Sequence, residues 1–207
     1  MDKASNFVEL KETSKIWAIG SIHSNLKSFS AIKKYILNNF KNSDKLIFLG
    51  NVIGLGDSSK ETLSSVIDLR FQLMSKFTLK PESIVFLRGA QEEMFSKLLQ
   101  LQLAPNPLEI LEWMFEHGVN KTIKSYGFSE NEIKSIASSG TINISKWTSS
   151  LNKSIQFNPG HIEYFLNLKH AAYSHTKKIL FVNRGVDITR PLSAQNDCFW
   201  WGFQNFS

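Results

Sequence analysis

Four short apolar runs are the clearest feature of the hydrophobic pattern along the chain. They occupy residues 16–19, 46–49, 84–87 and 179–182. Each run leads into a tight turn that contains glycine, a pattern typical of buried strands in layered α/β proteins. Ligand sites in such proteins are built at the carboxyl ends of the strands, so these four turns are the first place to look for function.

Amphipathic helical patterns connect the first three runs. The two apolar stripes consist of Leu26, Phe29, Ile32 and Ile36 and of Leu63, Ile67, Phe71 and Met74. Asn25 is placed to cap the first helix, and Pro81 ends the second connection before the third run. The resulting order, β-α-β-α-β, predicts parallel strands with helices packed on the sheet.

The segment from about residue 92 to 170 is predicted to be mainly helical. Helical spacing continues to about Tyr126, with a break at residues 105–107, and Pro159 and Gly160 open a further short helix. The serine-rich stretch 129–154 is too weakly periodic to assign. Residues 171–173 and the fourth apolar run flank a turn at 174–177, which indicates a hairpin.

Composition describes an ordinary globular protein. The chain has 207 residues, 42% hydrophobic and 20% charged, with a net charge of +6 and a pI near 9.3. The positive charge weakly favours anionic partners, but the lysines and arginines form no block, which disfavours nucleic acid as a partner. No apolar run approaches a transmembrane length, and no signal-peptide pattern is visible, so we expect a cytoplasmic protein without a membrane partner.

Residue types that bind metals or carry nucleophiles are sparse. Cys198 is the single cysteine, which excludes an internal disulfide and a thiolate metal cluster. Four histidines show no spacing typical of metal ligands; they are His117, His161, His170 and His175. The aromatic residues near the end of the sequence, from Phe199 to Phe206, are interpreted as core or interface. Ser21 lacks a neighbouring histidine–carboxylate pair, which disfavours a serine nucleophile.

Taken in order, the four turns resemble those of the calcineurin-like metallophosphoesterases, most closely the bacterial serine/threonine phosphatase and diadenosine tetraphosphatase branch. The turns here read Gly20-Ser21-Ile22-His23-Ser24, Gly50-Asn51-Val52-Ile53-Gly54-Leu55-Gly56, Gly89-Ala90-Gln91-Glu92 and Asn183-Arg184-Gly185. The family carries Gly-Asp-x-His-Gly, Gly-Asp-x-x-Asp-Arg-Gly, Gly-Asn-His-Glu and His-Ala/Gly-Gly at these places. The resemblance implies an α/β fold of layered β-sheets flanked by helices.

The family's two divalent metal ions, such as Mn, Fe or Zn, would lose most of their ligands here. By the resemblance, Ser21 replaces the first aspartate, Asn51 the bridging aspartate, Ala90 the asparagine and Asn183 the fourth-turn histidine, while His23 remains. Gly54 and Leu55 replace the second turn's Asp-Arg pair, and Gln91 replaces the histidine that acts as general acid. A dication needs carboxylate or imidazole ligands, so we expect no metal cofactor and no confident catalytic residue.

These replacements indicate a catalytically inactive homologue that acts as a binding or regulatory module. An altered or weakly metal-dependent phosphoesterase is the alternative, and a decayed product is a third reading. Arg88, Arg184 and His23 are candidate anion-binding residues for a phosphate-containing ligand, because guanidinium groups match phosphate geometry without a metal. His23 also reads as a structural residue, and Arg184 as a solvated one. Backbone geometry and capping explain the glycines of the turns together with Asn25 and Glu92; these glycines are Gly20, Gly50, Gly56, Gly89 and Gly185.

We expect an N-terminal extension at residues 1–14 and one domain at 15–207 with the helical insertion at about 92–170. By the resemblance, the sequence beyond residue 202 is too short to supply the last strands of the family's second sheet. An uncovered sheet edge favours pairing. A homodimer through that edge, or capture of a strand from a protein partner, is therefore expected, with a less stable fragment as the alternative.

Overall fold

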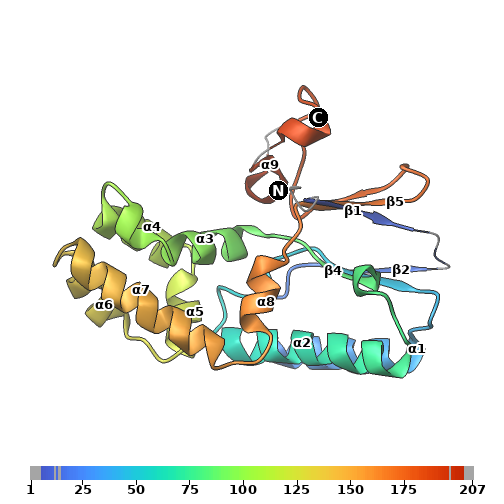
Figure 1. Ribbon diagram of the computed structural model, residues 1–207, viewed down its shortest axis with the longest axis horizontal. Coiled ribbons are helices and arrows are strands. Elements are labelled where there is room, and N and C mark those ends of the chain that lie inside the picture. Colours follow the sequence, from blue (N-terminus) through green and yellow to red (C-terminus); the bar gives the residue numbers. More distant parts are fainter. Residues whose placement is uncertain (1–5, 12, 14, 196, 203–207) are drawn as a thin grey trace.

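The computed structural model describes residues 6–11, 13, 15–195 and 197–202 (Figure 1). Its strands are β1 (Phe7–Leu10), β2 (Ile16–Ile19), β3 (Lys45–Phe48), β4 (Ile84–Phe86), β5 (Ala171–Ser174) and β6 (Leu180–Phe181). Its α-helices are α1 (Leu26–Asn39), α2 (Ser59–Lys76), α3 (Ala90–Leu98), α4 (Pro107–Glu116), α5 (Val119–Ser125), α6 (Glu130–Ala137), α7 (Thr141–Gln156), α8 (His161–Leu166) and α9 (Cys198–Trp201). Short 3-10 turns are η1 (Pro81–Ser83), η2 (Leu101–Leu103) and η3 (Leu192–Ala194).

The first sheet has the order β2-β3-β4 and is wholly parallel, as the sequence predicted. Because side chains alternate along a strand, β3 contributes to two cores. Leu46 and Phe48 pack with residues of α1 and α2, whereas Ile47 packs with Leu10 and Ala172 of the second sheet. Figure 1 shows α1 and α2 lying side by side along one face of this sheet. The carboxyl ends of its strands therefore point toward the helical part of the molecule.

The second sheet has the order β1-β5-β6. The predicted hairpin is confirmed, since β5 and β6 pair antiparallel around the turn at residues 174–177. The strand β1 pairs parallel with β5, with Val8 opposite Ala172. It lies inside the segment 1–14 that was expected to be an extension, and sequence reasoning overlooked it. On the outer side of this sheet, Ala171 packs against Phe199 and Trp200 of α9.

The helices α3 to α8 occupy the sequence between β4 and β5; α4 to α7 form the left part of the view in Figure 1, and α8 stands near its middle. The serine-rich stretch that had no assignment forms α6 and α7, which bury Ile133, Ile144 and Leu151. In the two earlier helices, the predicted stripes are too wide. Ile32 of α1 is 40% exposed and Phe71 of α2 is 58% exposed. In α2 the buried face runs through Val66, Leu69 and Leu73 instead of Phe71.

A buried polar chain joins α2 to the following helices. The Tyr126 hydroxyl lies 2.6 Å from Nδ1 of His161, and Nε2 of His161 lies 2.9 Å from the Ser64 hydroxyl. Burial and the positive charge of Lys60 lower the pKa of His161 to about 4. Burial raises the pKa of Tyr126 well above its usual value, so the phenol is neutral. His161 is thus a structural residue, in agreement with its lack of metal-ligand spacing in the sequence.

Among the residues that the structure describes, no helix combines the length and the apolar character needed to cross a bilayer.

Candidate functional site

The four turns meet at the carboxyl ends of β2, β3, β4 and β6. Asn51 is at the centre, and its side-chain amide nitrogen donates to the Ser21 hydroxyl at 3.2 Å and to Oδ1 of Asn183 at 3.4 Å. Its Oδ1 accepts the backbone N–H of Gln91 at 3.0 Å. Asn183 in turn donates to the carbonyl of Leu49 at 2.6 Å. The positions that sequence reasoning singled out are therefore brought together in one neutral hydrogen-bonded cluster.

This donor set does not fit the two-metal centre that the resemblance implies. Ser21, Asn51 and Asn183 carry no charge to offset a dication, and the Asn51 amide points its hydrogens at the other two residues. Within the described part of the chain, no three histidine, cysteine, aspartate or glutamate side chains gather where they could hold a metal ion. No reaction step through a metal follows from these residues.

His23 lies on the same turn as Ser21 in a left-handed backbone conformation, with φ of 48°. Its backbone N–H donates to the Asn51 carbonyl at 2.9 Å, which ties the first turn to the second. Burial lowers the pKa of His23, and a hydrogen bond with the Ile53 backbone acts in the opposite direction. Its Nδ1 is buried and has no hydrogen-bond partner among the described residues. A single imidazole, whose buried Nδ1 has no hydrogen-bond partner in the described residues, is what remains of the expected ligand set.

Gln91, which replaces the expected general acid, is buried and held by a backbone carbonyl. Its side-chain nitrogen donates to the His117 carbonyl at 2.8 Å, and the residue is only 6% exposed. Gly54 leaves the space that this amide fills, since a Cβ at residue 54 would lie 1.9 Å from Oε1 of Gln91. An amide has no proton to give to a leaving group at neutral pH. The site therefore has no acid at this position.

Leu55 and Ala90 complete the replaced positions. Leu55 has φ of 59° and is 53% exposed, and its side chain packs against Gly118 at the start of α5. Ala90 opens α3 and is partly buried. Neither side chain has a polar group, so neither can bind a metal or an anion.

Glu92 is the structural support of the site. Its carboxylate accepts backbone N–H groups of Asn51 and Val52, both at 2.8 Å, and of Gly89 at 3.1 Å. The Tyr164 hydroxyl lies 3.3 Å away and donates as well. Burial raises the pKa of Glu92, and these N–H donors oppose that shift by stabilising its charge. Glu92 thus fixes the second turn onto the third, which agrees with its interpretation as a backbone support.

The two candidate anion-binding arginines differ in how they are held. The Arg88 guanidinium is partly buried, pairs with Glu93 at 2.6 Å and lies 5.7 Å from the Trp200 ring. Arg184 is exposed, and its aliphatic stem packs against Gly202. Arg88 therefore has a carboxylate partner already, whereas the Arg184 guanidinium is open to solvent. Anion binding by these residues stays a prediction.

Sequence reasoning missed the groups that hold the cluster in place. The His117 carbonyl anchors Gln91, and Ser59 bridges Ser24 at 2.7 Å and Thr122 at 3.1 Å behind the second turn. These contacts join residues far apart in the sequence, so no local pattern points to them. The exposed rings of Trp113 and His117, 4.3 Å apart, also lie beside this site.

Comparison with known proteins places this geometry in a recognisable fold. No protein-family model matches the sequence, and no curated protein matches it either. Two solved structures that resemble it are "Crystal structure of a putative diadenosine tetraphosphatase" and a protein serine/threonine phosphatase from Saccharomyces cerevisiae with similarity to human phosphatase PP5. The TM-scores are 0.50 and 0.47, and the sequence identities are 14% and 19%.

The alignments cover 92% and 94% of this chain but 60% and 48% of the two solved structures, so the chain spans less than two thirds of their length. The likeness to the putative diadenosine tetraphosphatase, at a TM-score of 0.50, concerns the fold alone, and the α/β fold that the four turns predicted is confirmed.

Proposed function

We propose that this chain, which has the fold of the calcineurin-like metallophosphoesterases, is a catalytically inactive homologue that serves as a binding or regulatory module. The observation that supports the proposal is the neutral cluster of Ser21, Asn51 and Asn183 at the place where the fold would hold its metals. The cluster uses its hydrogen-bonding groups internally. It keeps the shape of the site while removing the charge on which the chemistry of that fold depends.

The loss of activation is large in physical terms. A metal-bound water titrates near pH ~7, against about 15.7 for bulk water. Without the metals, the attacking water is harder to deprotonate by a free energy on the order of 12 kcal/mol, which corresponds to that pKa difference. The Gln91 amide, bound to the His117 carbonyl, supplies no proton to a leaving group. We therefore expect no phosphoester hydrolysis above background.

A hydrolase with an altered, weakly metal-dependent site is the second candidate. The buried Nδ1 of His23 favours it, because that nitrogen has no partner in the described residues and faces no competing hydrogen bond. After a local rearrangement, this nitrogen could bind a ligand atom, or a cation whose other ligands come from another molecule.

Metal analysis of the purified protein, combined with phosphatase assays, separates the two candidates. The substrates are p-nitrophenyl phosphate, phosphopeptides and dinucleoside polyphosphates, each with and without added Mn²⁺. We expect less than one bound metal per chain and no turnover. Stoichiometric metal, together with turnover that His23→Ala abolishes, would refute the inactive assignment and support the altered hydrolase.

His117→Ala is a matched control for that variant. It removes an exposed imidazole close to the site, while the carbonyl that anchors Gln91 belongs to the backbone and remains. Turnover that both variants abolish would indicate general damage instead of a role for His23.

A further inference from the structure

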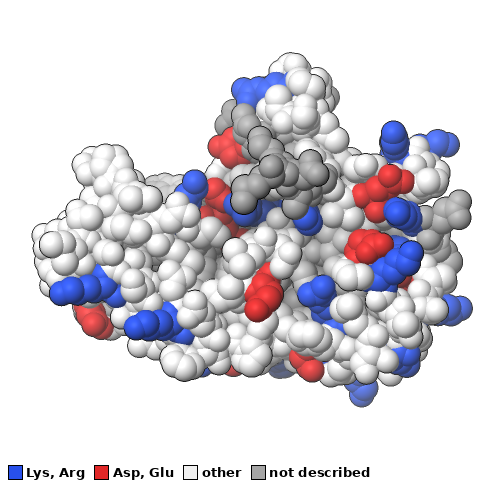
Figure 2. All heavy atoms as spheres, in the orientation of Figure 1, with Lys and Arg blue, Asp and Glu red and all other residues white. Residues whose placement is uncertain are grey.

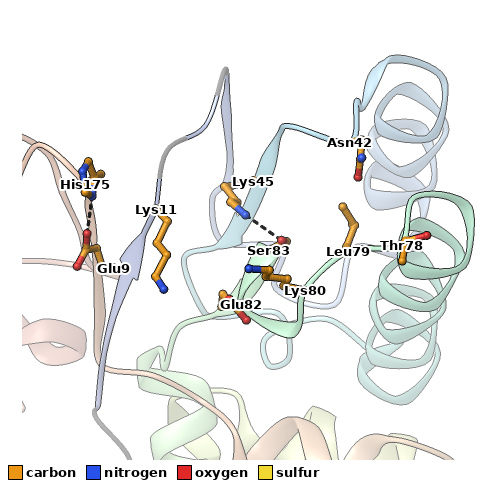
Figure 3. A pocket seen from close by; sticks show the side chains of 10 residues that line it. All are labelled: Glu9, Lys11, Asn42, Lys45, Thr78, Leu79, Lys80, Glu82, Ser83 and His175. Carbon is orange, nitrogen blue, oxygen red and sulfur yellow. Dashed lines mark hydrogen bonds and ion pairs between the residues drawn. The ribbon is translucent and has the colours of Figure 1, made fainter.

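A second hollow lies at the opposite, amino-terminal end of the first sheet. It has a volume of about 490 Å³ and is formed by the end of β1, the start of β3 and the segment from residue 78 to η1 (Figure 3). This volume falls in the range of small-molecule sites. The hollow shares no residue with the cluster around Asn51.

Three lysines from three separate segments line this hollow: Lys11, Lys45 and Lys80. Lys45 is held in place, since its ammonium donates to the buried Ser83 hydroxyl at 2.9 Å. Figure 3 shows the Lys80 side chain beside Ser83 and Lys11 on the β1 side of the hollow. Within the described residues, Lys11 and Lys80 have no ion-pair partner.

The acidic residues of the hollow do not balance these lysines. The Glu9 carboxylate lies 2.6 Å from Nδ1 of His175, so it already has a hydrogen-bond partner. Glu82 is the remaining carboxylate that lines the hollow. The three ammonium groups surround one hollow and repel one another most strongly at low ionic strength. Two carboxylates do not balance three ammonium groups, and a bound anion relieves the remaining repulsion.

We propose that this hollow binds a small molecule that carries a phosphate group. Phosphate carries about −1.5 to −2 charges at neutral pH and offers several acceptor oxygens. Ammonium groups bind it as point charges, without the planar geometry that an arginine fork imposes. The Asn42 side chain also lines the hollow and supplies an amide donor. Figure 2 shows basic and acidic side chains close together at the right of the view, with no broad basic face there.

Titration of the full chain with inorganic phosphate, followed by amide chemical shifts at constant low ionic strength, tests the proposal. We expect shifts at residues 42–45 and 78–83. Lys80→Gln, which removes an exposed charge, weakens binding about fivefold, and Lys45→Gln weakens it at least as much. Glu82→Gln removes the opposing charge and tightens binding. Lys153→Gln on α7 changes it by less than twofold.

Two results would overturn the site. One is the absence of shifts at 42–45 and 78–83, including the case in which shifts appear only at the turns 20–25, 51–56 and 183–185. The other is equal weakening by Lys80→Gln and the distant Lys153→Gln, which would indicate a non-specific charge effect. If Lys45→Gln does not fold because its bond to Ser83 is lost, Lys80→Gln and Glu82→Gln still decide the question, since they must act in opposite directions.

Discussion

The Gln91 side chain packs so closely against Gly54 that it fills the space a side chain at residue 54 would need. A Cβ on Gly54 would lie 1.9 Å from Oε1 and 2.3 Å from Cδ of Gln91. Gly54 also has φ of 85°, a conformation that other residues adopt only with strain. The residues at these two positions are therefore coupled, because a side chain at residue 54 requires the Gln91 side chain to move.

Substitution of both residues measures this coupling. Gly54→Ala should destabilise the protein by about 2 kcal/mol or more, because overpacking and a left-handed alanine each contribute about 1 kcal/mol. Gln91→Ala in the same chain should recover about half of that loss by removing the clash, as denaturant unfolding measures. Strictly additive effects of the two substitutions would contradict the contact.

Charge restored to the central cluster should restore metal affinity without restoring catalysis. We expect Ser21→Asp with Asn51→Asp to bind Mn²⁺ at least about tenfold more tightly than the parent, by calorimetry. Turnover of p-nitrophenyl phosphate should stay at background while Ala90, Gln91 and Asn183 remain. Ser21→Asn is the uncharged control. Rapid hydrolysis by the double variant would show that other groups suffice.

Because of His161, the free energy of unfolding should decrease as the pH is lowered, at pH values above those at which most carboxylates titrate. Its pKa is about 4 in the folded chain and 6.5 as the unperturbed value, so the unfolded state binds the proton more readily. The stabilisation is complete above pH 6.5 and is lost as pH falls toward 4, by no more than about 3 kcal/mol. Urea unfolding between pH 7 and 4.5 should show this slope. The slope should be shallower in His161→Gln, and an unchanged slope would exclude the assignment.

Release of Arg88 should increase anion binding at the cluster. Glu93 holds the Arg88 guanidinium, so Glu93→Gln leaves it with a weaker, neutral partner. We expect phosphate to bind that variant more tightly at low ionic strength, with shifts at residues 51–56 and 183–185. Salt should screen the effect. Glu116→Gln, an exposed change at the end of α4, is the control. No gain in affinity would argue against an anion role for Arg88.

Much of the scaffold was predictable because its strands are short apolar runs and its turns are local. The three parallel strands of the first sheet, the Asn25 cap and the hairpin followed from such patterns. The strand β1 did not, because Phe7, Val8 and Leu10 surround a glutamate and gain their partner only from β5. The helices α6 and α7 were also missed, since serine weakens helix propensity and packing supplies their order.

The candidate site was predictable in its residues but not in its contacts. The resemblance identified Ser21, Asn51 and Asn183, whereas their mutual hydrogen bonds depend on strands from opposite ends of the sequence. The fit of Gln91 against Gly54 was equally hidden, because no pattern within one turn records what another turn leaves empty. Side-chain direction is set by tertiary packing, which local spacing does not encode.

The parallel pairing of β1 with β5 constrains the order in which the chain can fold. Val8 lies opposite Ala172, so this ladder closes a loop that contains the whole first sheet and every helix from α1 to α8. Such distant pairing slows folding, because the loop-closure entropy must be overcome before the strand contacts compensate for it. On the ribosome, the first sheet can form as soon as β4 has emerged, while β1 waits without its partner until most of the chain is made. During that interval β1 is an unpaired, partly apolar strand, the kind of segment that chaperones protect.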